Sequence, residues 1–263
     1  MIKLIALDLD NTLLEKDNTI APETLNLLKE CASKGITIVL ATGRLFHSAK
    51  KYADLIGPET KIICYNGCLI TESNGMPLFT SFLDTDIMRK VVDFTRLHGL
   101  YCQFYEDHNI LVEKITEGTT IDPDLKNTHA VEVGDFDSHL FVPSPKAMIV
   151  APPDTVPKYQ NMLNDHLGGK AYLAQSQPYL IEIMPEGINK ASSLSLLCEK
   201  LEIPRHQTMA FGDNTNDLEM VSWAGIGVAV ANSVEQLKIA ADYVCSKERS
   251  LGVAEAIKKF ICS

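Results

Sequence analysis

Short apolar runs alternate with helix-like segments near both ends of this chain, and this alternation restricts the possible fold more than any other feature. In the first part of the chain the apolar runs are 3–7, 36–41 and 61–65, and the helix-like segments between them are 22–34 and 45–56. Nearly continuous apolar runs are typical of strands buried on both faces, as in parallel sheets. Pro22 suits the first position of a helix, and Gly35 suits its end. The order therefore predicts a doubly wound parallel sheet.

The same alternation returns near the C-terminus, after an interruption. The later helices are expected at 190–201, 214–224, 233–241 and 251–262, and the strands at 208–212, 226–230 and 243–244. In the interruption we expect helices at 85–98 and 154–167, strands at 100–105, 109–113, 146–151, 171–175 and 179–184, and loops at 114–128 and 134–145. We therefore predict an α/β, Rossmann-like core from residues 1–82 and 186–263, with an α+β domain, residues 83–185, inserted into it.

The charge of the chain limits its partners. It has 24 Lys and Arg against 34 Asp and Glu, a net charge of −10. The inserted segment, residues 83–185, holds 8 of the basic and 15 of the acidic residues. An acidic chain is poorly suited to bind nucleic acid, because phosphate backbones attract Lys and Arg. The acidic inserted domain also makes a polyphosphorylated substrate less favourable.

The sequence predicts a cytoplasmic protein with no membrane partner. No apolar run approaches the roughly 18 residues of a spanning helix. The apolar N-terminal stretch reaches Asp8 and Asp10 and lacks the small-residue cleavage site of a signal peptide. The seven cysteines are scattered without a CxxC pair, which suits reduced thiols better than disulfides.

Two acidic residues directly follow the first predicted strand, in Asp8-Leu9-Asp10-Asn11-Thr12. If this segment is extended, Asp8 and Asp10 point the same way, beyond the carboxyl end of the strand. Two carboxylates that close repel each other unless a cation or proton lies between them, and oxygen ligands suit magnesium. The alternative is a turn that happens to be acidic.

Two further segments suit an anion site. Thr42-Gly43-Arg44 follows the second strand and offers a hydroxyl and backbone N–H groups at the start of a helix, although Thr there is also a common helix cap. For Arg44 a structural or electrostatic role is expected. Lys190 begins a helix, where its charge opposes the helix dipole, so a bound anion would explain it. The alternative for Lys190 is a solvated surface lysine.

The last segment, Gly212-Asp213-Asn214-Thr215-Asn216-Asp217, follows one strand and begins a helix. Asp213 and Asp217 are four residues apart and lie near one helical face. Acids in a first helical turn also interact favourably with the dipole, which is the structural alternative. Since the carboxyl ends of parallel strands share one edge, all four segments can converge there.

These segments together resemble the haloacid dehalogenase (HAD) superfamily, and within it the Cof-type sugar-phosphatase-like group with a large C2-type cap. Tyr65-Asn66-Gly67 also resembles the Asn-Gly loop that this group has after the third strand. The resemblance covers essentially the whole chain, although the inserted domain matches only in position and length. Similar proteins usually have Ser before the motif lysine and Gly after it, where this chain has Asn189 and Ala191.

The resemblance implies a role for each motif residue. Asp8 would be the nucleophile that forms an aspartyl-phosphate, and Asp10 the general acid and then base. Thr42, Gly43, Lys190 and Asn216 would hold the phosphoryl group. Asp8, the backbone carbonyl of Asp10, and Asp213 would bind Mg²⁺, and Asp217 would order a metal-bound water.

The function implied is a magnesium-dependent phosphatase acting on a small phosphorylated metabolite, possible substrates including sugar phosphates. Two alternatives stay open. A phosphohexomutase of the same superfamily would use the same nucleophile, and a non-enzymatic phospho-acceptor or binding module would also place Asp at a strand end. The sequence predicts neither the physiological substrate nor the oligomeric state.

Overall fold

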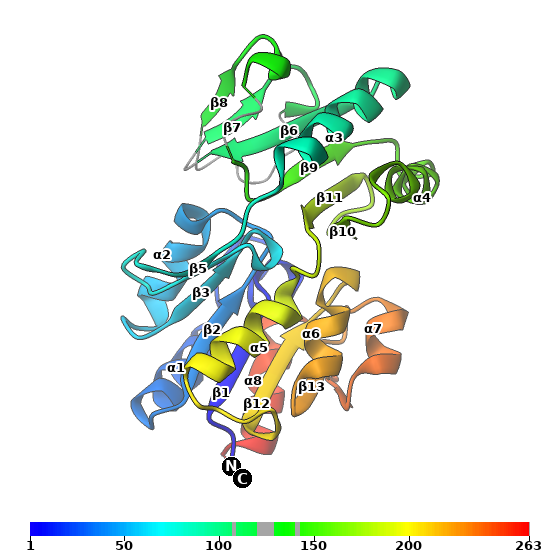
Figure 1. The fold of residues 1–263 in the computed structure, drawn as a ribbon. Coiled ribbons are helices and arrows are strands. Elements are labelled where there is room, and N and C mark those ends of the chain that lie inside the picture. Colours follow the sequence, from blue (N-terminus) through cyan, green and yellow to red (C-terminus); the bar gives the residue numbers. More distant parts are fainter. Residues whose placement is uncertain (107–108, 120–128, 140–142, 263) are drawn as a thin grey trace. The chain divides into compact units, whose positions relative to one another are not determined.

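Buried apolar strands form the centre of the larger unit of the computed structural model, which describes residues 1–106, 109–119, 129–139 and 143–262 (Figure 1). Eight strands form one sheet in the order β14-β13-β12-β1-β2-β3-β4-β5. Their bounds are β1 Leu4–Leu7, β2 Thr37–Ala41, β3 Lys61–Cys64, β4 Leu69–Thr71, β5 Pro77–Thr80, β12 Thr208–Gly212, β13 Ile226–Ala229 and β14 Tyr243–Val244. The six strands from β14 to β3 are parallel, and β4 pairs antiparallel with β3.

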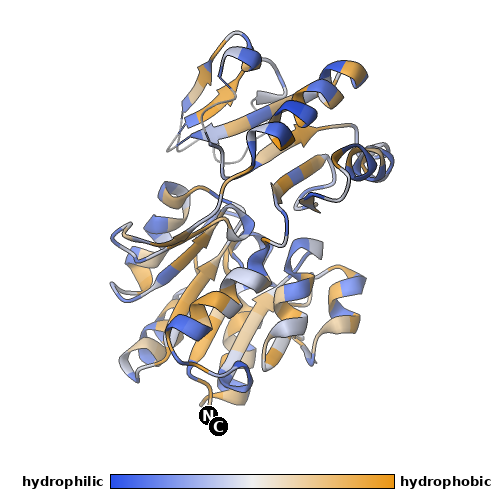
Figure 2. Cartoon of the chain, in the orientation of Figure 1, coloured by the Kyte–Doolittle hydropathy of each residue, from blue (hydrophilic) through white to orange (hydrophobic). Residues whose placement is uncertain are grey.

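Helices cover both faces of this sheet. They are α1 Pro22–Ser33, α2 Phe46–Ile56, α5 Lys190–Lys200, α6 Leu218–Trp223, α7 Glu235–Ala240 and α8 Arg249–Phe260. Leu194 and Leu197 of α5 and Met220 of α6 pack with Ala6 and Ala210 of the sheet in one buried cluster. On the other face, α1 contacts both α2 and α8. Strands β1, β2 and β12 are apolar along their length, as parallel strands buried on both faces require (Figure 2).

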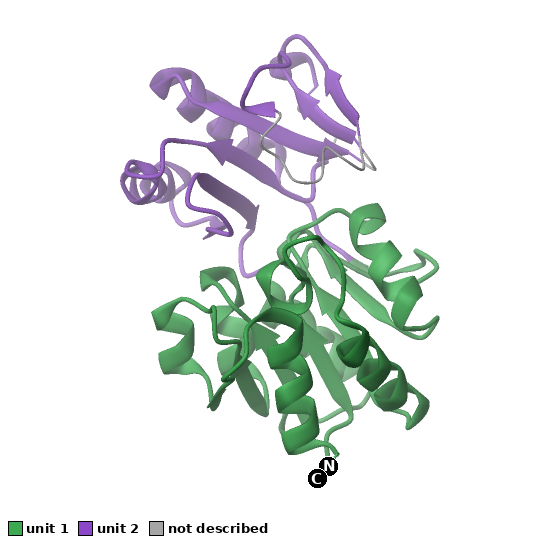
Figure 3. Cartoon of the chain, turned by 180° about the vertical axis from the view of Figure 1, so that it is seen from behind, with its two compact units in different colours: residues 1–79, 189–263 green, residues 80–188 purple. Residues whose placement is uncertain are grey.

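The chain divides into two compact units (Figure 3). The first contains Met1–Phe79 and Asn189–Ser263, and the second contains Thr80–Ile188. The second unit therefore begins three residues before, and ends three residues after, the inserted domain that the sequence predicts.

The second unit is a two-layer α+β domain. Its sheet has the order β10-β11-β9-β6-β7-β8. The strands are β6 Tyr101–Glu106, β7 Asn109–Val112, β8 His129–Glu132, β9 Ala147–Val150, β10 Ala171–Ala174 and β11 Leu180–Pro185, and the helices are α3 Thr85–His98 and α4 Val156–Leu167. Val91 of α3 and Leu163 of α4 pack with Phe104, Ile149 and Ile181 of the sheet. The predicted fold class, a parallel-sheet core with an inserted α+β domain, is confirmed.

Three short strands, β4, β5 and β8, have no counterpart in the sequence prediction. Each has three or four residues, and β5 and β8 are largely open to solvent, so neither a long apolar run nor a clear alternation marks them. Of the predicted loops 114–128 and 134–145, residues 120–128 and 140–142 lie outside the described part of the chain. Among the described residues, every helix is too short or too polar to span a bilayer.

Candidate active site

Four of the predicted motifs lie at the carboxyl ends of adjacent strands. Asp8 directly follows β1, Thr42 follows β2, Tyr65 follows β3 and Asp213 follows β12. These strands are neighbours in the sheet, and the backbone N–H of Asp8 donates to Phe211 of β12 at 3.1 Å. The convergence expected for a parallel sheet is therefore present.

Lys190 joins two of these motifs through a buried ammonium group. Its Nζ donates to Oδ1 of Asp8 at 2.7 Å and to Oδ1 of Asp217 at 2.6 Å. Lys190 is 1% exposed and Asp217 fully buried. Burial by itself would lower the pKa of Lys190, but the charges of Asp217 and Asp8 raise it above its usual value, so the side chain stays cationic. The alternative of a solvated lysine is wrong.

The local sequence before Lys190 begins helix α5 with a capping box. The side chain of Asn189 accepts from the backbone N–H of Ser192 at 2.8 Å, and the hydroxyl of Ser192 accepts from the backbone N–H of Asn189 at 3.0 Å. Asn189 therefore replaces the usual Ser of similar proteins with another good N-cap residue. Lys190 is then fixed at the first position of the helix.

The segment after β12 folds tightly around the side chain of Asp217. Oδ2 of Asp217 accepts from the backbone N–H groups of Asp213 at 3.0 Å and Asn214 at 3.2 Å. A Cβ atom at Gly212 would lie 2.4 Å from Cβ of Asp217, so only glycine fits there. Oδ1 of Asp213 accepts from the hydroxyl of Thr12 at 2.9 Å, which ties this segment to the one after β1.

Asp8, Asp213 and Asp217 form a cluster that could hold a metal ion. Each offers one carboxylate oxygen, and these three atoms lie within 4.8 Å of one another. Burial, and next the charge of Asp217, raise the pKa of Asp8 well above its usual value and that of Asp213 to about 7. The single positive charge of Lys190 therefore does not balance the negative charges of the three carboxylates. The oxygen-only donor set fits a hard divalent cation.

Asp10 has a different cationic partner from Asp8. Nε of Arg44 donates to Oδ2 of Asp10 at 2.8 Å, and Nη2 donates to Oδ1 at 2.5 Å. The Asp10 side chain is 40% exposed, whereas that of Arg44 is 9% exposed. The backbone is extended at Asp8 (φ −65°, ψ 153°) and at Asp10 (φ −72°, ψ 123°), as expected, and it turns at Asn11, which has a φ of 63°. Asp8 and Asp10 therefore have different cationic partners, Lys190 and Arg44. The ion pair with Asp10 agrees with the electrostatic role expected of Arg44.

The predicted phosphate-binding residues lie at the same edge of the sheet. Thr42 is fully buried, and its hydroxyl accepts from the backbone N–H of Arg44 at 3.2 Å. It does not cap helix α2, which begins at Phe46 with Leu45 as its N-cap residue. The carbonyl of Thr42 accepts from the backbone N–H of Asn66 at 3.0 Å. The side chain of Asn66 in turn accepts from Nδ2 of Asn216 at 3.3 Å. Gly43 lies between Thr42 and Arg44 in the chain. These hydrogen bonds connect the predicted phosphate-binding segments after β2 and β12 through Asn66.

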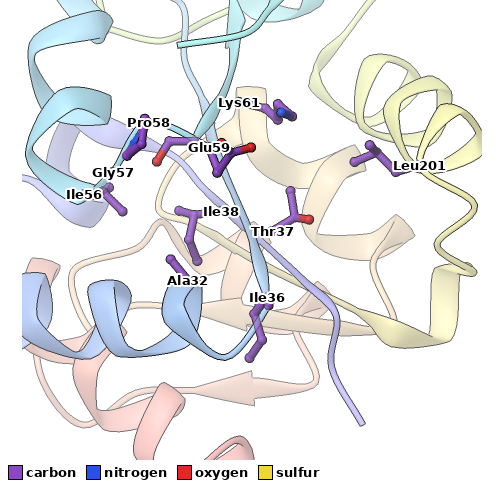
Figure 4. Close-up of a pocket in the computed structure, with 12 residues that line it drawn as sticks. Ala32, Ile36, Thr37, Ile38, Ile56, Gly57, Pro58, Glu59, Lys61 and Leu201 are labelled. Atoms are coloured by element: carbon purple, nitrogen blue, oxygen red, sulfur yellow. The ribbon is translucent and has the colours of Figure 1, made fainter.

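A cavity of about 530 Å³ lies elsewhere, where β2 and β3 begin (Figure 4). Ile36, Ile38 and Ile56 are among its lining residues, with Lys61 and Leu201 at other points of its wall. It contains none of the predicted site residues. Because it lies at the amino ends of the strands, this cavity is separate from the acidic cluster.

Comparison with known proteins agrees with this geometry. The family model described as haloacid dehalogenase-like hydrolase matches residues 5–257. The chain belongs to the haloacid dehalogenase-like hydrolase family. The predictions of this superfamily, and of an enzyme of its hydrolase type, are therefore confirmed.

Relatives of this hydrolase match along its whole length. The 5-amino-6-(5-phospho-D-ribitylamino)uracil phosphatase YitU of Bacillus subtilis (strain 168) is 31% identical over 98% of this chain and 97% of its own. An HMP-PP phosphatase of Yersinia pestis (strain Pestoides F) is 28% identical over 90% of this chain and 87% of its own. The crystal structure of a haloacid dehalogenase-like hydrolase from Bacteroides thetaiotaomicron matches with a TM-score of 0.87 and 31% identity, covering 99% of this chain and all of that one.

Thr12, Arg44 and Asn66 connect separate segments of the site through hydrogen bonds, and none of them was assigned a catalytic role from the sequence. Thr12 contacts Asp213 across 201 positions of sequence. Thr12 and Arg44 lie within predicted motifs, and the signal for Asn66 is the Asn-Gly pair after a strand, which is typical of a turn with an unusual backbone conformation.

Proposed function

We propose that this hydrolase is a magnesium-dependent phosphatase that hydrolyses a small phosphomonoester through a phosphorylated Asp8. The observation that carries the proposal is the buried contact between Lys190 and Asp8 beside two further carboxylates. Such a site combines an oxygen nucleophile, a fixed cation and a metal-binding donor set, which are the parts that phosphoryl transfer requires.

We assign the metal to Asp8, the backbone carbonyl of Asp10, and Asp213. Both oxygens of Asp217 already accept hydrogen bonds, Oδ1 from Lys190 and Oδ2 from two backbone N–H groups. Among the described residues none donates to Oδ2 of Asp8 or Oδ2 of Asp213. This difference supports Asp8 and Asp213 as direct ligands and Asp217 as the partner of a metal-bound water. When bound, Mg²⁺ would neutralise charge on the phosphoryl group and on Asp8.

In the first step an oxygen of Asp8 attacks phosphorus while the bond from phosphorus to the leaving oxygen breaks. Protonated Asp10 gives its proton to that oxygen, so the alcohol leaves neutral. Thr42, the backbone of Gly43, Lys190 and Asn216 hold the phosphoryl oxygens during this transfer. Lys190 is suited to this role because it is cationic and cannot turn away from Asp8.

In the second step a water attacks the phosphorylated Asp8, and the bond between phosphorus and the Asp8 oxygen breaks. Asp10, now ionised, takes a proton from that water, and orthophosphate leaves. The two hydrogen bonds from Arg44 orient the Asp10 carboxylate.

We infer that the substrate is a small phosphorylated metabolite selected by the inserted domain, residues 83–185. The names of two relatives, the YitU phosphatase and the HMP-PP phosphatase, support this substrate class. The shared chemistry is located in the core unit, while the inserted unit has its own core and can vary separately.

The test is release of orthophosphate from a panel of phosphorylated metabolites and one aryl phosphate. Each assay is run with Mg²⁺, with EDTA and with the Asp8→Asn variant; Asp17→Asn, which changes an exposed carboxylate, is the matched control. We expect release that needs both Mg²⁺ and Asp8. Equal release by Asp8→Asn would refute the mechanism. Interconversion of sugar phosphates without release would indicate a mutase, and a stable phosphorylated Asp8 without turnover would indicate an acceptor module.

A further inference from the structure

The loop after β3 holds Asn66 in a constrained backbone conformation beside the proposed phosphate site. Tyr65 and Asn66 both have positive φ values, 52° and 54°. The backbone N–H of Tyr65 donates to the carbonyl of Arg44 at 3.1 Å, and that of Asn66 donates to the carbonyl of Thr42 at 3.0 Å. Two consecutive residues in the left-handed region are costly and persist only where surrounding contacts impose them, which occurs often at functional sites.

The same loop packs against the first turn of α5, next to Lys190. A Cβ atom at Gly67 would lie 2.4 Å from the carbonyl oxygen of Asn189, so the approach is possible only for glycine. The hydroxyl of Ser193 donates to the carbonyl of Gly67 at 2.6 Å. Asn66 is therefore fixed between the segment of Thr42 and the start of α5.

Asn66 is 1% exposed, and of the two polar atoms of its side chain only the oxygen has a hydrogen-bond partner among the described residues. Its Oδ1 accepts from Nδ2 of Asn216 at 3.3 Å, while its Nδ2 is buried and has no partner among the described residues. Rotating the Asn66 amide alone would bring two NH₂ groups together, so the contact with Asn216 fixes the orientation. A buried donor without an acceptor is rare and calls for an explanation.

We propose that Asn66 is a phosphate-binding residue whose Nδ2 donates to a non-bridging oxygen of the phosphoryl group. The inference rests on the proposed function, because it places that group among Thr42, Lys190 and Asn216. Asn66 contacts Thr42 through its backbone and Asn216 through its side chain, so its unused donor belongs to a residue bonded to two members of this set. A bound phosphoryl oxygen supplies the acceptor that Nδ2 lacks.

Two substitutions separate this role from a purely structural one. Asn66→Asp keeps an oxygen that accepts from Asn216, but it replaces the donor with an anionic oxygen; Asn66→Ala removes both amide groups and adds no charge. The matched control is Thr71→Val, because the hydroxyl of Thr71 is also buried without a partner among the described residues but lies on β4, opposite the first half of β3. The readouts are equilibrium binding of orthophosphate with Mg²⁺, turnover of an aryl phosphate, and the thermal midpoint.

We expect Asn66→Asp and Asn66→Ala to weaken orthophosphate binding by about 10- to 100-fold, as for loss of a hydrogen bond to a charged group, and Thr71→Val to leave it unchanged. If Asn66→Asp binds orthophosphate within threefold of wild type, Asn66 only supports Asn216 and the inference is wrong. Asn66→Ser, which is uncharged and lacks the amide donor, replaces Asn66→Ala if that variant does not fold.

Binding and turnover also distinguish the two proposals from each other. Wild-type turnover with unchanged binding by the Asn66 variants would refute the role of Asn66 alone. Asn66-dependent binding of orthophosphate by a wild-type protein that releases none from any substrate would refute the proposed phosphatase and support the role of Asn66. No binding and no turnover by wild type would refute both.

Discussion

The ammonium group of Lys190 lies 2.7 Å from Oδ1 of Asp8, although 182 positions of sequence separate the two residues. The whole inserted unit, Thr80–Ile188, lies between them in the chain. The candidate site is therefore complete only after the two separate parts of the core unit have folded together. Its stability and its chemistry depend on the same buried charges.

Lys190→Met should destabilise the protein and abolish phosphate release. The change leaves Asp8 and Asp217 buried without their cation, and breaking a buried ion pair in this way costs about 3–5 kcal/mol. Urea unfolding and the phosphatase assay measure the two effects. Lys50→Met, which breaks a pair between Lys50 and Asp54 on the surface of α2, should cost less than about 1 kcal/mol. Equal midpoints for the two variants would contradict this account.

Magnesium should stabilise the folded protein through Asp213. A ligand that binds only the folded state adds about 3 kcal/mol to the free energy of unfolding when present at about 100 times its Kd. We expect Mg²⁺ to raise the thermal midpoint of wild type and EDTA to reverse the rise. Asp213→Asn should lose most of this response because it removes one carboxylate of the cluster, whereas Asp17→Asn should keep it. An unchanged response in Asp213→Asn would place the metal elsewhere.

Arg44→Lys should lower kcat by about 10- to 100-fold, as expected when a catalytic group loses its orientation, with little change in KM. Lysine keeps the charge but cannot donate two parallel hydrogen bonds to the Asp10 carboxylate as the guanidinium does. Steady-state kinetics on an aryl phosphate provide the check, with Asp10→Asn as the reference for complete loss of proton transfer. A rise in KM alone would instead mean that Arg44 binds the substrate.

Glu255 of α8 should make stability depend on acidic pH. Burial by itself would raise the pKa of Glu255, but hydrogen bonds from Ser246 and Tyr243, and from the backbone N–H of Lys247, lower it to about 2. Because the folded pKa lies below the unfolded one, the stabilisation is present above about pH 4.5 and is lost as the pH falls towards 2.

We expect Glu255→Gln to cost about 2 kcal/mol at pH 7, after allowance for partial exposure of the side chain. The difference from wild type should shrink between about pH 4.5 and pH 2. Denaturant unfolding at several pH values measures it, and Glu59→Gln, which changes an exposed carboxylate outside the ion pairs of the described residues, serves as the control. A difference that stays constant down to pH 2 would mean that packing, not ionisation, is involved.

The sequence predicted the convergence of the site well, because parallel strands bring their carboxyl ends to one edge whatever their separation in the chain. The prediction that Asp8, Thr42 and Asp213 each follow a parallel strand was enough to place them at the same edge of the sheet. Their roles in binding and catalysis stay predictions until they are measured.

Contacts that depend on side-chain direction could not be predicted in this way. The pairing of Asp10 with Arg44 depends on the directions of two side chains 34 positions apart in the sequence, which the extended backbone at Asp10 does not determine. The position of Asn66 depends on two consecutive positive φ values and on the absence of a side chain at Gly67. Short strands such as β4 were missed because three residues carry too little pattern.

The capping box at Asn189 has a consequence for how such enzymes diversify. The chain leaves the second unit at Ile188 and reaches Lys190 two residues later, with the helix start already fixed by Asn189, Ser192 and the carbonyl of Gly67. Everything that orients the lysine thus belongs to the core. The hundred or so residues of the second unit can therefore change in length or sequence without changing the groups that hold Lys190 at the start of its helix.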